Sequence, residues 1–304
     1  MFKQITWLFI SLILGVPLYG QRNAKYPLSD LSPTLIEKSV AVVRMYEETL
    51  DIQGINRATN RVKYAITVLN KAGEDYGVFH EYYDKFVSIG NIQATIYDSD
   101  GSVIEKVKAA DIKDYSATSS FSIYDDNRQK YFPPQVKGFP YTVEYEYTCN
   151  YNGIFHLPSW SPFPGYDVAV EKSRFVITTP EDYKLNYREY NLPVGVSVRD
   201  DGKRITYEWE VSDMPPVEQE EYAPYLEDFM PYVMTAPVDF EFDGYTGNMS
   251  TWEEFGMWQL RLLEGRDNIP QDIGIKIMGM VDTIDNPVER SRQFINMCRN
   301  LPGM

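Results

Sequence analysis

Two cysteines, Cys149 and Cys298, and two histidines, His80 and His156, are the side chains of this 304-residue sequence best suited to nucleophilic or metal chemistry. A catalytic thiol needs a lowered pKa, which a helix N-terminus or a neighbouring histidine provides. Cys298 falls near the C-terminal end of a predicted helix, where the helix dipole disfavours a thiolate. Both histidines fall in strand-rich segments without a carboxylate at metal-ligand spacing. We therefore predict no catalytic residue, no metal site, no cofactor and two buried, unreactive cysteines.

The stretch DFEFDG at residues 239–244 matches the first half of a calcium-binding loop. The twelfth position of such a loop should be a bidentate glutamate, but here it is Ser250. The stretch is therefore predicted to be a strand with its two phenylalanines facing inward.

A proline-rich loop, HLPSWSPFPGY, gathers the side chains of His156, Trp160, Phe163 and Tyr166. Aromatic rings on loops can stack on sugars or hold peptides, and they can also close the end of a sheet sandwich. We favour the closing role for this loop, and in the alternative interpretation these four residues are the candidate binding residues of the sequence, with a glycan or a peptide as the ligand.

Composition narrows the classes of partner. Hydrophobic residues make up 43% and aromatic residues 14% of the chain, which is typical of a folded, globular protein. The formal net charge of −15 would repel phosphate backbones, so nucleic-acid binding and adhesion to anionic lipid are not expected.

The first 20 residues have the order of a secretory signal peptide. Lys3 supplies the positive charge, Ile5 to Leu14 form the apolar core, and Tyr19-Gly20 precede a possible cleavage point. The apolar run is too short to span a bilayer comfortably, so we expect cleavage and no transmembrane span afterwards. This predicts an exported protein, either periplasmic or at the cell surface or secreted.

Residues 38–212 show the pattern of many short strands. The segment YTVEYEYTCNY alternates, with Tyr141, Val143, Tyr145 and Tyr147 on one face, and Cys149 falls on that same face. Turn residues at 98–101 and 200–202 predict two hairpins. The fold class predicted from this pattern is mainly β, as a large antiparallel β-sandwich with a short α-helical C-terminal extension.

The composition changes after the last predicted strand. Residues 215–249 are acidic and rich in proline, which predicts an extended connector. Residues 250–304 predict three helices, which begin near Thr251, Pro270 and Asn286. The second helix carries an apolar stripe that something must cover. We expect it to fold back on the sandwich, or alternatively to meet a protein partner or a second copy.

Several strand segments, in their order along the chain, resemble the DUF3857 domain. They are NIQATIYDSDGSVIEKVKAADIKD, IYDDNRQKYFPPQVKGFPYTVEYEYTCNYNGIFHLPSW and EKSRFVITTPEDYKLNYR. That family's β-rich modules usually precede a transglutaminase-like domain in exported bacterial proteins, and STWEEFGMWQLRLLEGRDNIPQD resembles the passage into that second domain. Its Gly-Asp-Cys nucleophile motif has no counterpart here, because Cys298 lacks the preceding Gly-Asp and no histidine follows it. The resemblance therefore carries no catalytic residue to this sequence.

The sequence is thus divided into a signal peptide (1–20), a DUF3857-like β-sandwich (21–214), a connector (215–249) and a helical extension (250–304). We expect an exported, non-catalytic module that acts in binding or assembly. The alternatives are an N-terminal fragment or split part of a transglutaminase-like peptidase or cross-linking enzyme, and a carbohydrate-binding module.

Cleavage of the signal peptide gives the first prediction. The mature protein should begin near Gln21, because the charged, apolar and small residues that precede it follow the order that signal peptidase requires. Intact-mass spectrometry of the exported protein checks this, and retention of Met1 and Lys3 in that protein would contradict it.

Overall fold

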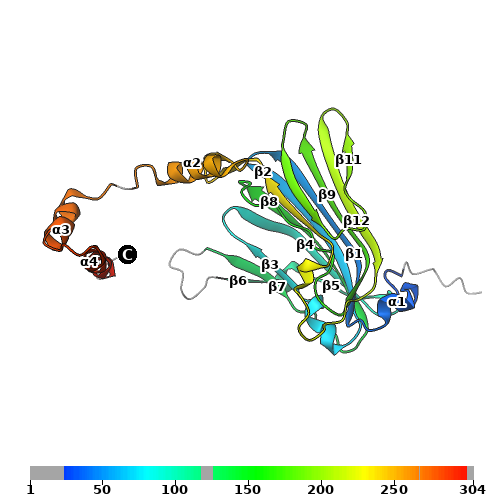
Figure 1. Ribbon diagram of the computed structural model, residues 1–304. Coiled ribbons are helices and arrows are strands. Elements are labelled where there is room, and N and C mark those ends of the chain that lie inside the picture. Colours follow the sequence, from blue (N-terminus) through cyan, green and yellow to red (C-terminus); the bar gives the residue numbers. More distant parts are fainter. Residues whose placement is uncertain (1–23, 118–125, 267, 300–304) are drawn as a thin grey trace, which may run out of the picture. The chain divides into compact units, whose positions relative to one another are not determined.

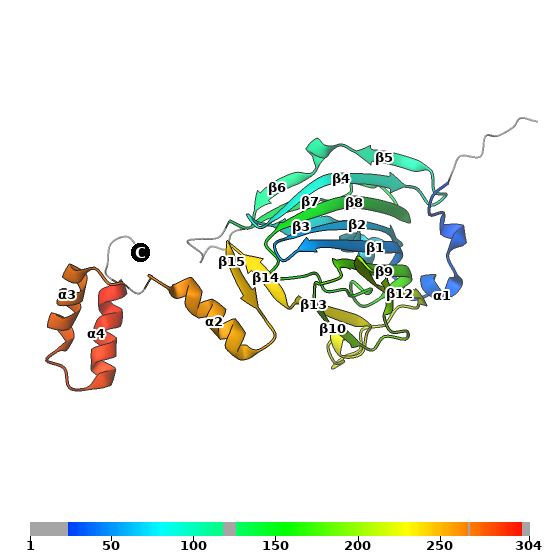
Figure 2. The same cartoon turned by 90° about the horizontal axis from the view of Figure 1, so that it is seen from above.

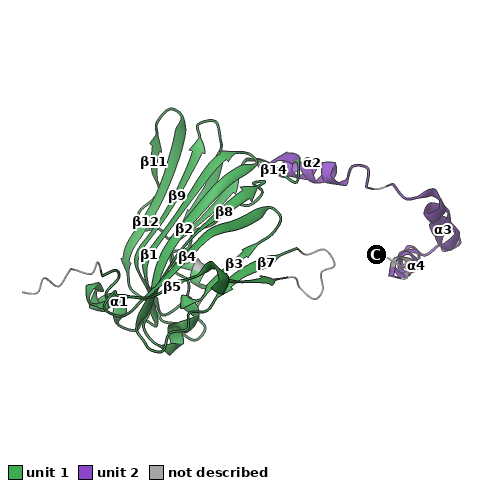
Figure 3. Ribbon diagram, turned by 180° about the vertical axis from the view of Figure 1, so that it is seen from behind, with its two compact units in different colours: residues 1–244 green, residues 245–304 purple. Residues whose placement is uncertain are grey.

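The computed structural model describes residues 24–117, 126–266 and 268–299 of the chain, and the predicted signal peptide lies outside them. The chain divides into two compact units, Met1–Gly244 and Tyr245–Met304 (Figure 3). The first unit holds the strands that the sequence predicts, and the second holds the three long helices.

An eight-stranded sheet is the frame of the first unit (Figure 1). Its strands, in spatial order, are β11 (Ser197–Asp200), β12 (Arg204–Met214), β9 (Val168–Pro180), β1 (Ala41–Gly54), β2 (Arg57–Val68), β8 (Tyr141–Asn152), β4 (Val87–Tyr97) and β5 (Val103–Val107). Neighbouring strands are antiparallel except β1 and β9, which run parallel from Ala41 beside Val168 to Asp51 beside Thr178. The predicted antiparallel sheet is thus confirmed with one parallel pairing at its centre.

Shorter elements complete the first unit (Figure 2). A three-stranded sheet has the order β3 (Phe79–Tyr83), β7 (Arg128–Phe132), β6 (Lys113–Ser116), and β10 (Leu185–Tyr190) pairs with β13 (Tyr232–Pro237). The remaining elements are α1 (Pro33–Ile36), β14 (Asp239–Phe242) and the 3-10 turns η1 (Leu28–Asp30), η2 (Lys71–Gly77), η3 (Ala109–Asp111) and η4 (Leu226–Asp228).

One face of the large sheet forms the hydrophobic core. The alternation predicted for β8 is confirmed, because Tyr141, Val143, Tyr145, Tyr147 and Cys149 are all buried in one cluster. The three-stranded sheet covers them through buried Phe79 and Phe132, which belong to the same cluster. Burial of these rings, at about 25 cal/mol per Å² of apolar surface, holds the two layers together.

A second core cluster lies on the same face, around β9 and β12. The ring of Trp160 stacks 6.4 Å from that of Phe175, which stacks 5.6 Å from that of Trp209. The indole Nε1 of Trp160 donates a hydrogen bond of 3.0 Å to Ser173 Oγ. The polar edge of the buried ring is therefore satisfied, as burial requires.

Both predicted hairpin turns are confirmed by their local chemistry. Asp98 Oδ1 accepts hydrogen bonds from the backbone amides of Asp100 and Ser102, at 3.0 and 2.8 Å. Gly101 follows with a φ of +80°, and a Cβ there would lie 2.7 Å from the carbonyl oxygen of Lys25. A side chain at this position would therefore meet both backbone strain and a clash.

The proline-rich segment 215–249 is more than an extended connector. Val233 and Phe240, on β13 and β14, are fully buried, and the strand prediction for residues 239–242 is confirmed. Their partners lie far back in the chain: β13 pairs with β10, and Val233 forms an isolated bridge with Trp160. Such partners cannot be read from the local pattern of prolines and acids.

The second unit contains β15 (Tyr245–Asn248), α2 (Trp252–Leu263), α3 (Gln271–Val281) and α4 (Pro287–Arg299). The predicted caps of the first and third helices are confirmed. Thr251 Oγ1 accepts from the amide of Glu254 at 3.1 Å, and Asn286 Oδ1 accepts from the amide of Val288 at 2.9 Å. Pro287 occupies the first helical position of α4, where its missing N–H costs nothing.

Two tryptophans give a matched test of the core. Trp160 is 1% exposed and Trp252 is 89% exposed. Trp160→Ala should lower the free energy of unfolding by about 3–5 kcal/mol, the usual loss for a buried aromatic residue. Trp252→Ala should leave it within about 0.5 kcal/mol. Urea unfolding followed by circular dichroism measures both, and equal losses in the two variants would refute the assignment of Trp160 to the core.

Candidate functional site

The thiol of Cys149, the cysteine whose side chain the structure describes, is buried and unreactive. Cys149 is buried on β8, and burial, followed by the charges of Glu81 and Glu48, raises its pKa to about 12. It is therefore a neutral thiol at physiological pH and a poor nucleophile. The side chain of Cys298 lies outside the described residues, so the prediction made for it stays a prediction.

The two histidines are exposed and each packs against an aromatic ring. His80 lies on β3 with its ring centroid 4.5 Å from that of Tyr82, and His156 lies in the loop after β8, 4.5 Å from Phe155. Within the described residues, no three His, Cys, Asp or Glu side chains come together in a way that could hold a metal ion.

The four aromatic-loop residues are placed differently from one another. Trp160 and Phe163 are buried against the apolar face of the large sheet, which agrees with the interpretation that the loop closes the sandwich. The half-buried Tyr166 donates its hydroxyl to the carbonyl oxygen of Pro224 at 2.9 Å. His156 is left as the exposed member, and the structure does not present the four as one binding surface.

Two carboxyl groups meet between the layers of the sandwich. Glu48, on β1, is 4% exposed and faces into the core. It accepts hydrogen bonds of 2.7 Å from the hydroxyl of Tyr46 and from Nδ2 of Asn60, on β2. Glu81, on β3 of the covering sheet, is partly buried on the other side. An acid at an inward position of an alternating strand, as in Tyr46-Glu47-Glu48-Thr49-Leu50, is the sequence signal that points to this pair.

Burial disfavours the charge on both carboxyls. Burial, followed by the charge of Glu48, raises the pKa of Glu81 to about 7, and a hydrogen bond with Tyr147 opposes the shift. Burial likewise raises the pKa of Glu48 while its bonds from Tyr46 and Asn60 lower it. The buried amide oxygen of Asn60 has no hydrogen-bond partner among the described residues. The pair therefore takes up a proton near neutral pH.

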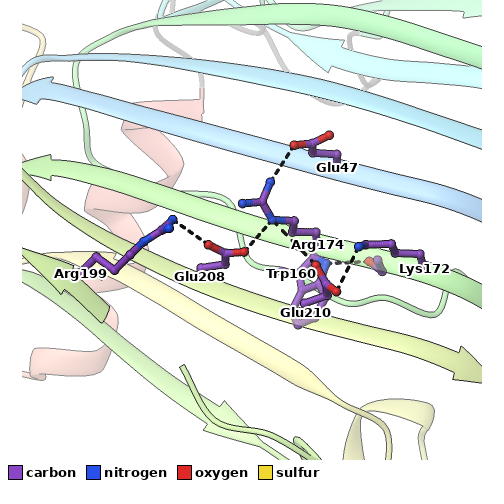
Figure 4. Close-up of polar contacts among 8 residues, drawn as sticks. Glu47, Trp160, Lys172, Arg174, Arg199, Glu208 and Glu210 are labelled. Atoms are coloured by element: carbon purple, nitrogen blue, oxygen red, sulfur yellow. Dashed lines mark hydrogen bonds and ion pairs between the residues drawn. The ribbon is translucent and has the colours of Figure 1, made fainter. Parts of the chain in front are cut away.

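The opposite face of the sheet carries a ladder of ion pairs across four neighbouring strands (Figure 4). Its members are Glu47, Lys172, Arg174, Arg199, Glu208 and Glu210. Arg174 joins Glu47 of β1 at 2.9 Å to Glu208 of β12 at 2.8 Å. Partly exposed ion pairs of this kind each contribute little to stability, so we assign the ladder to a solvated surface.

The helix α2 is apolar on two sides. One side carries Phe255, buried Trp258 and Leu262, as the sequence predicts, with the first two rings 5.6 Å apart. The other side exposes four large apolar side chains: Trp252, Met257, Leu260 and Leu263. We call these four the α2 apolar face.

The side chains described for α3 and α4 also form no buried core. No residue of α3 is fully buried, although its stripe contains Ile273, Ile277 and Val281. Ile275 of α3 and Val288 of α4 are largely exposed. A soluble helix buries its apolar side, so these helices present surface that a folded assembly would cover.

Comparison with known proteins identifies relatives of the chain. A family model described as "Domain of Unknown Function with solved-structure structure (DUF3857)" matches residues 56–218. A solved structure described as a "putative protease" from Parabacteroides distasonis matches with a TM-score of 0.63 and 13% identity, over 86% of this chain and 50% of that chain. At this identity the match shows a shared fold, and this chain spans about half the length of that protein. A search of the curated proteins found no match.

None of the helices in the described residues combines the length and the apolar character that crossing a membrane requires.

The carboxyl pair predicts a particular dependence of stability on pH. Because the pKa of Glu81 is higher in the folded than in the unfolded chain, its contribution is complete below about pH 4.5 and is lost as the pH rises through 7. Glu81→Gln should flatten this fall and raise the free energy of unfolding above pH 7 by roughly 2–3 kcal/mol. Urea titrations between pH 5 and 8 measure it, with Glu105→Gln on exposed β5 as the control. A steeper fall in Glu81→Gln than in the wild type would contradict the assignment.

Proposed function

Because the chain belongs to the DUF3857 family, we propose that it is an exported, non-catalytic β module that assembles with a folded protein domain through its second unit. The observation that carries the proposal is the α2 apolar face. A helix that is apolar on two sides is stable in water when both sides are covered. The four exposed side chains amount to a few hundred Å², and leaving them wet forgoes several kcal/mol at about 25 cal/mol per Å².

The first unit does not need these helices to complete its core. Its hydrophobic clusters are built entirely from residues before Gly244, the last being Met230 in one cluster and Val233 in the other. Buried strands of the large sheet are covered by the three-stranded sheet and by the loop that carries Trp160. This supports a separate protein surface, rather than the sandwich, as the cover for the helices.

A transglutaminase-like domain is the occupant that we propose. The helical segment 250–304 resembles the passage into such a domain, and this chain matches about half of the solved chain from Parabacteroides distasonis. In this proposal the helices form the first layer of that domain, and the remainder packs on the α2 apolar face. The domain lies either on the same polypeptide or on another.

The catalytic work belongs to that domain in this proposal. The thiol of Cys149 is buried and neutral, and the residues around Cys298 lack the Gly-Asp that precedes a nucleophile in the resembled enzymes. Export is supported by the order of residues in the first 20 positions. In this proposal the β-sandwich supports and positions the transglutaminase-like domain outside the cytoplasm.

The exposed state of the α2 apolar face is tested with the purified protein and the dye 8-anilinonaphthalene-1-sulfonate, which fluoresces on apolar surface. The protein should be monomeric by sedimentation velocity and should bind the dye. Leu260→Glu combined with Leu263→Glu should reduce dye fluorescence several-fold and leave the melting temperature within about 2 °C, because both residues are solvated in the free protein. Gln259→Glu, an exposed polar position of the same helix, is the matched control.

Two other results would overturn the proposal. Absence of dye binding together with a lower melting temperature in the double variant would mean that the chain covers its own helices. A dimer that the double variant dissociates would mean that a second copy is the occupant. For the positive case, a photo-crosslinker placed at Leu260 in the host cell should join a transglutaminase-like domain, while one at Gln259 should not.

A further inference from the structure

The three-stranded sheet has a second face that the fold leaves open. Phe79 and Phe132 point into the core, so the residues that alternate with them point away from it. The outward residues are His80, Tyr82, Lys113, Tyr115, Gln129 and Tyr131. We call these six residues the aromatic face.

Their rings form a continuous row across all three strands. The ring of His80 lies 4.5 Å from Tyr82 along β3 and 6.2 Å from Tyr131 on β7. Tyr131 in turn lies 6.3 Å from Tyr115 on β6. Strand register produces the row, since His80 is paired with Tyr131, and Gln129 lies between Tyr82 and Tyr115.

The row is open to solvent and has polar groups within it. Tyr82 is 60% exposed and Tyr115 is 48% exposed, so much of each ring is accessible to a ligand. The side-chain amide of Gln129 is hydrogen bonded to the Nε2 of His80, and this bond fixes the imidazole between the tyrosines. Rigid rings with hydroxyl, amide and imidazole groups at their edges offer contact area at a low cost in conformational entropy.

The chemistry of the face selects a class of ligand. The six residues include no aliphatic side chain and no carboxylate, and Lys113 is their one permanently charged member. A polyanion would be repelled by the net charge of −15, and an apolar peptide segment would find rings but no aliphatic pocket. A sugar has an apolar C–H side and a rim of hydroxyls, which complement a tyrosine ring and its polar neighbours.

We propose that the aromatic face binds a neutral glycan chain, with sugar rings stacked on Tyr82 and Tyr115 and hydroxyls bonded to Gln129 and His80. The site is distinct from the aromatic loop at residues 156–166, whose Trp160 and Phe163 are buried. It is also independent of the α2 apolar face, so either surface can be tested without the other. Glycan binding would place the module on a polysaccharide outside the cytoplasm.

Native affinity electrophoresis tests the proposal, using gels that contain hydroxyethyl cellulose, xylan, glucomannan or mannan. The wild type should be retarded by at least one of these neutral polysaccharides. Tyr82→Ala and Tyr115→Ala should each weaken binding about tenfold, the loss expected on removing one stacking ring, while Tyr82→Trp should retain it. Tyr222→Ala is the control, because Tyr222 is the most exposed tyrosine and lies on another segment.

Several results would contradict glycan binding by the aromatic face. The proposal is wrong if none of the four polysaccharides retards the wild type, or if retardation survives in Tyr82→Ala and Tyr115→Ala. Retardation by polygalacturonate alone would mean an anionic ligand and would also overturn it. So would binding of fluorescently labelled casein that both alanine variants abolish, since that result would assign the face to unfolded polypeptide.

Discussion

The apolar face of the eight-stranded sheet is the constraint on which the rest of the first unit depends. Its strands bury one side from β4 to β12, and the described residues of that unit include no α-helix longer than the four residues of α1 to cover it. The cover is instead made from strands and loops: the three-stranded sheet lies over Tyr145, and the loop carrying Trp160 lies over Phe175. The sandwich is the result of this requirement.

The same requirement explains where the polar groups lie. Covering the sheet with strands brings Glu81 of one layer over Glu48 of the other, so two acids share a buried space and hold a proton near neutral pH. The opposite side is covered by α1 around Val42 and Ala169, and its open part carries the ion pairs of Arg174 with its neighbours. The covering sheet has an outward side as well, and that side holds the aromatic face.

Much of this fold could be predicted from sequence, because alternation and turn chemistry are local. The buried side of β8, the turns at Gly101 and Gly202 and the caps at Thr251 and Asn286 all follow from neighbouring residues. The parallel pairing of β1 with β9 could not be predicted. The paired residues lie more than 120 positions apart in the sequence, and no local sequence pattern distinguishes parallel from antiparallel pairing here. The local sequence also leaves the placement of Trp160 open, because a loop rich in proline and aromatic residues has the same local pattern whether it caps a core or faces solvent. The open surface on the three-stranded sheet emerges only when its strands are in register.

We propose that the helices of the second unit are completed by another protein domain. Hydrogen–deuterium exchange of the purified chain tests it most directly, because amide protection reports the free energy of local opening. We expect the amides of α3 and α4 to exchange within minutes, while those of β1, β2 and β8 stay protected for hours or longer. Protection of α3 and α4 equal to that of the core strands would contradict it, since the helices would then be stable without a partner.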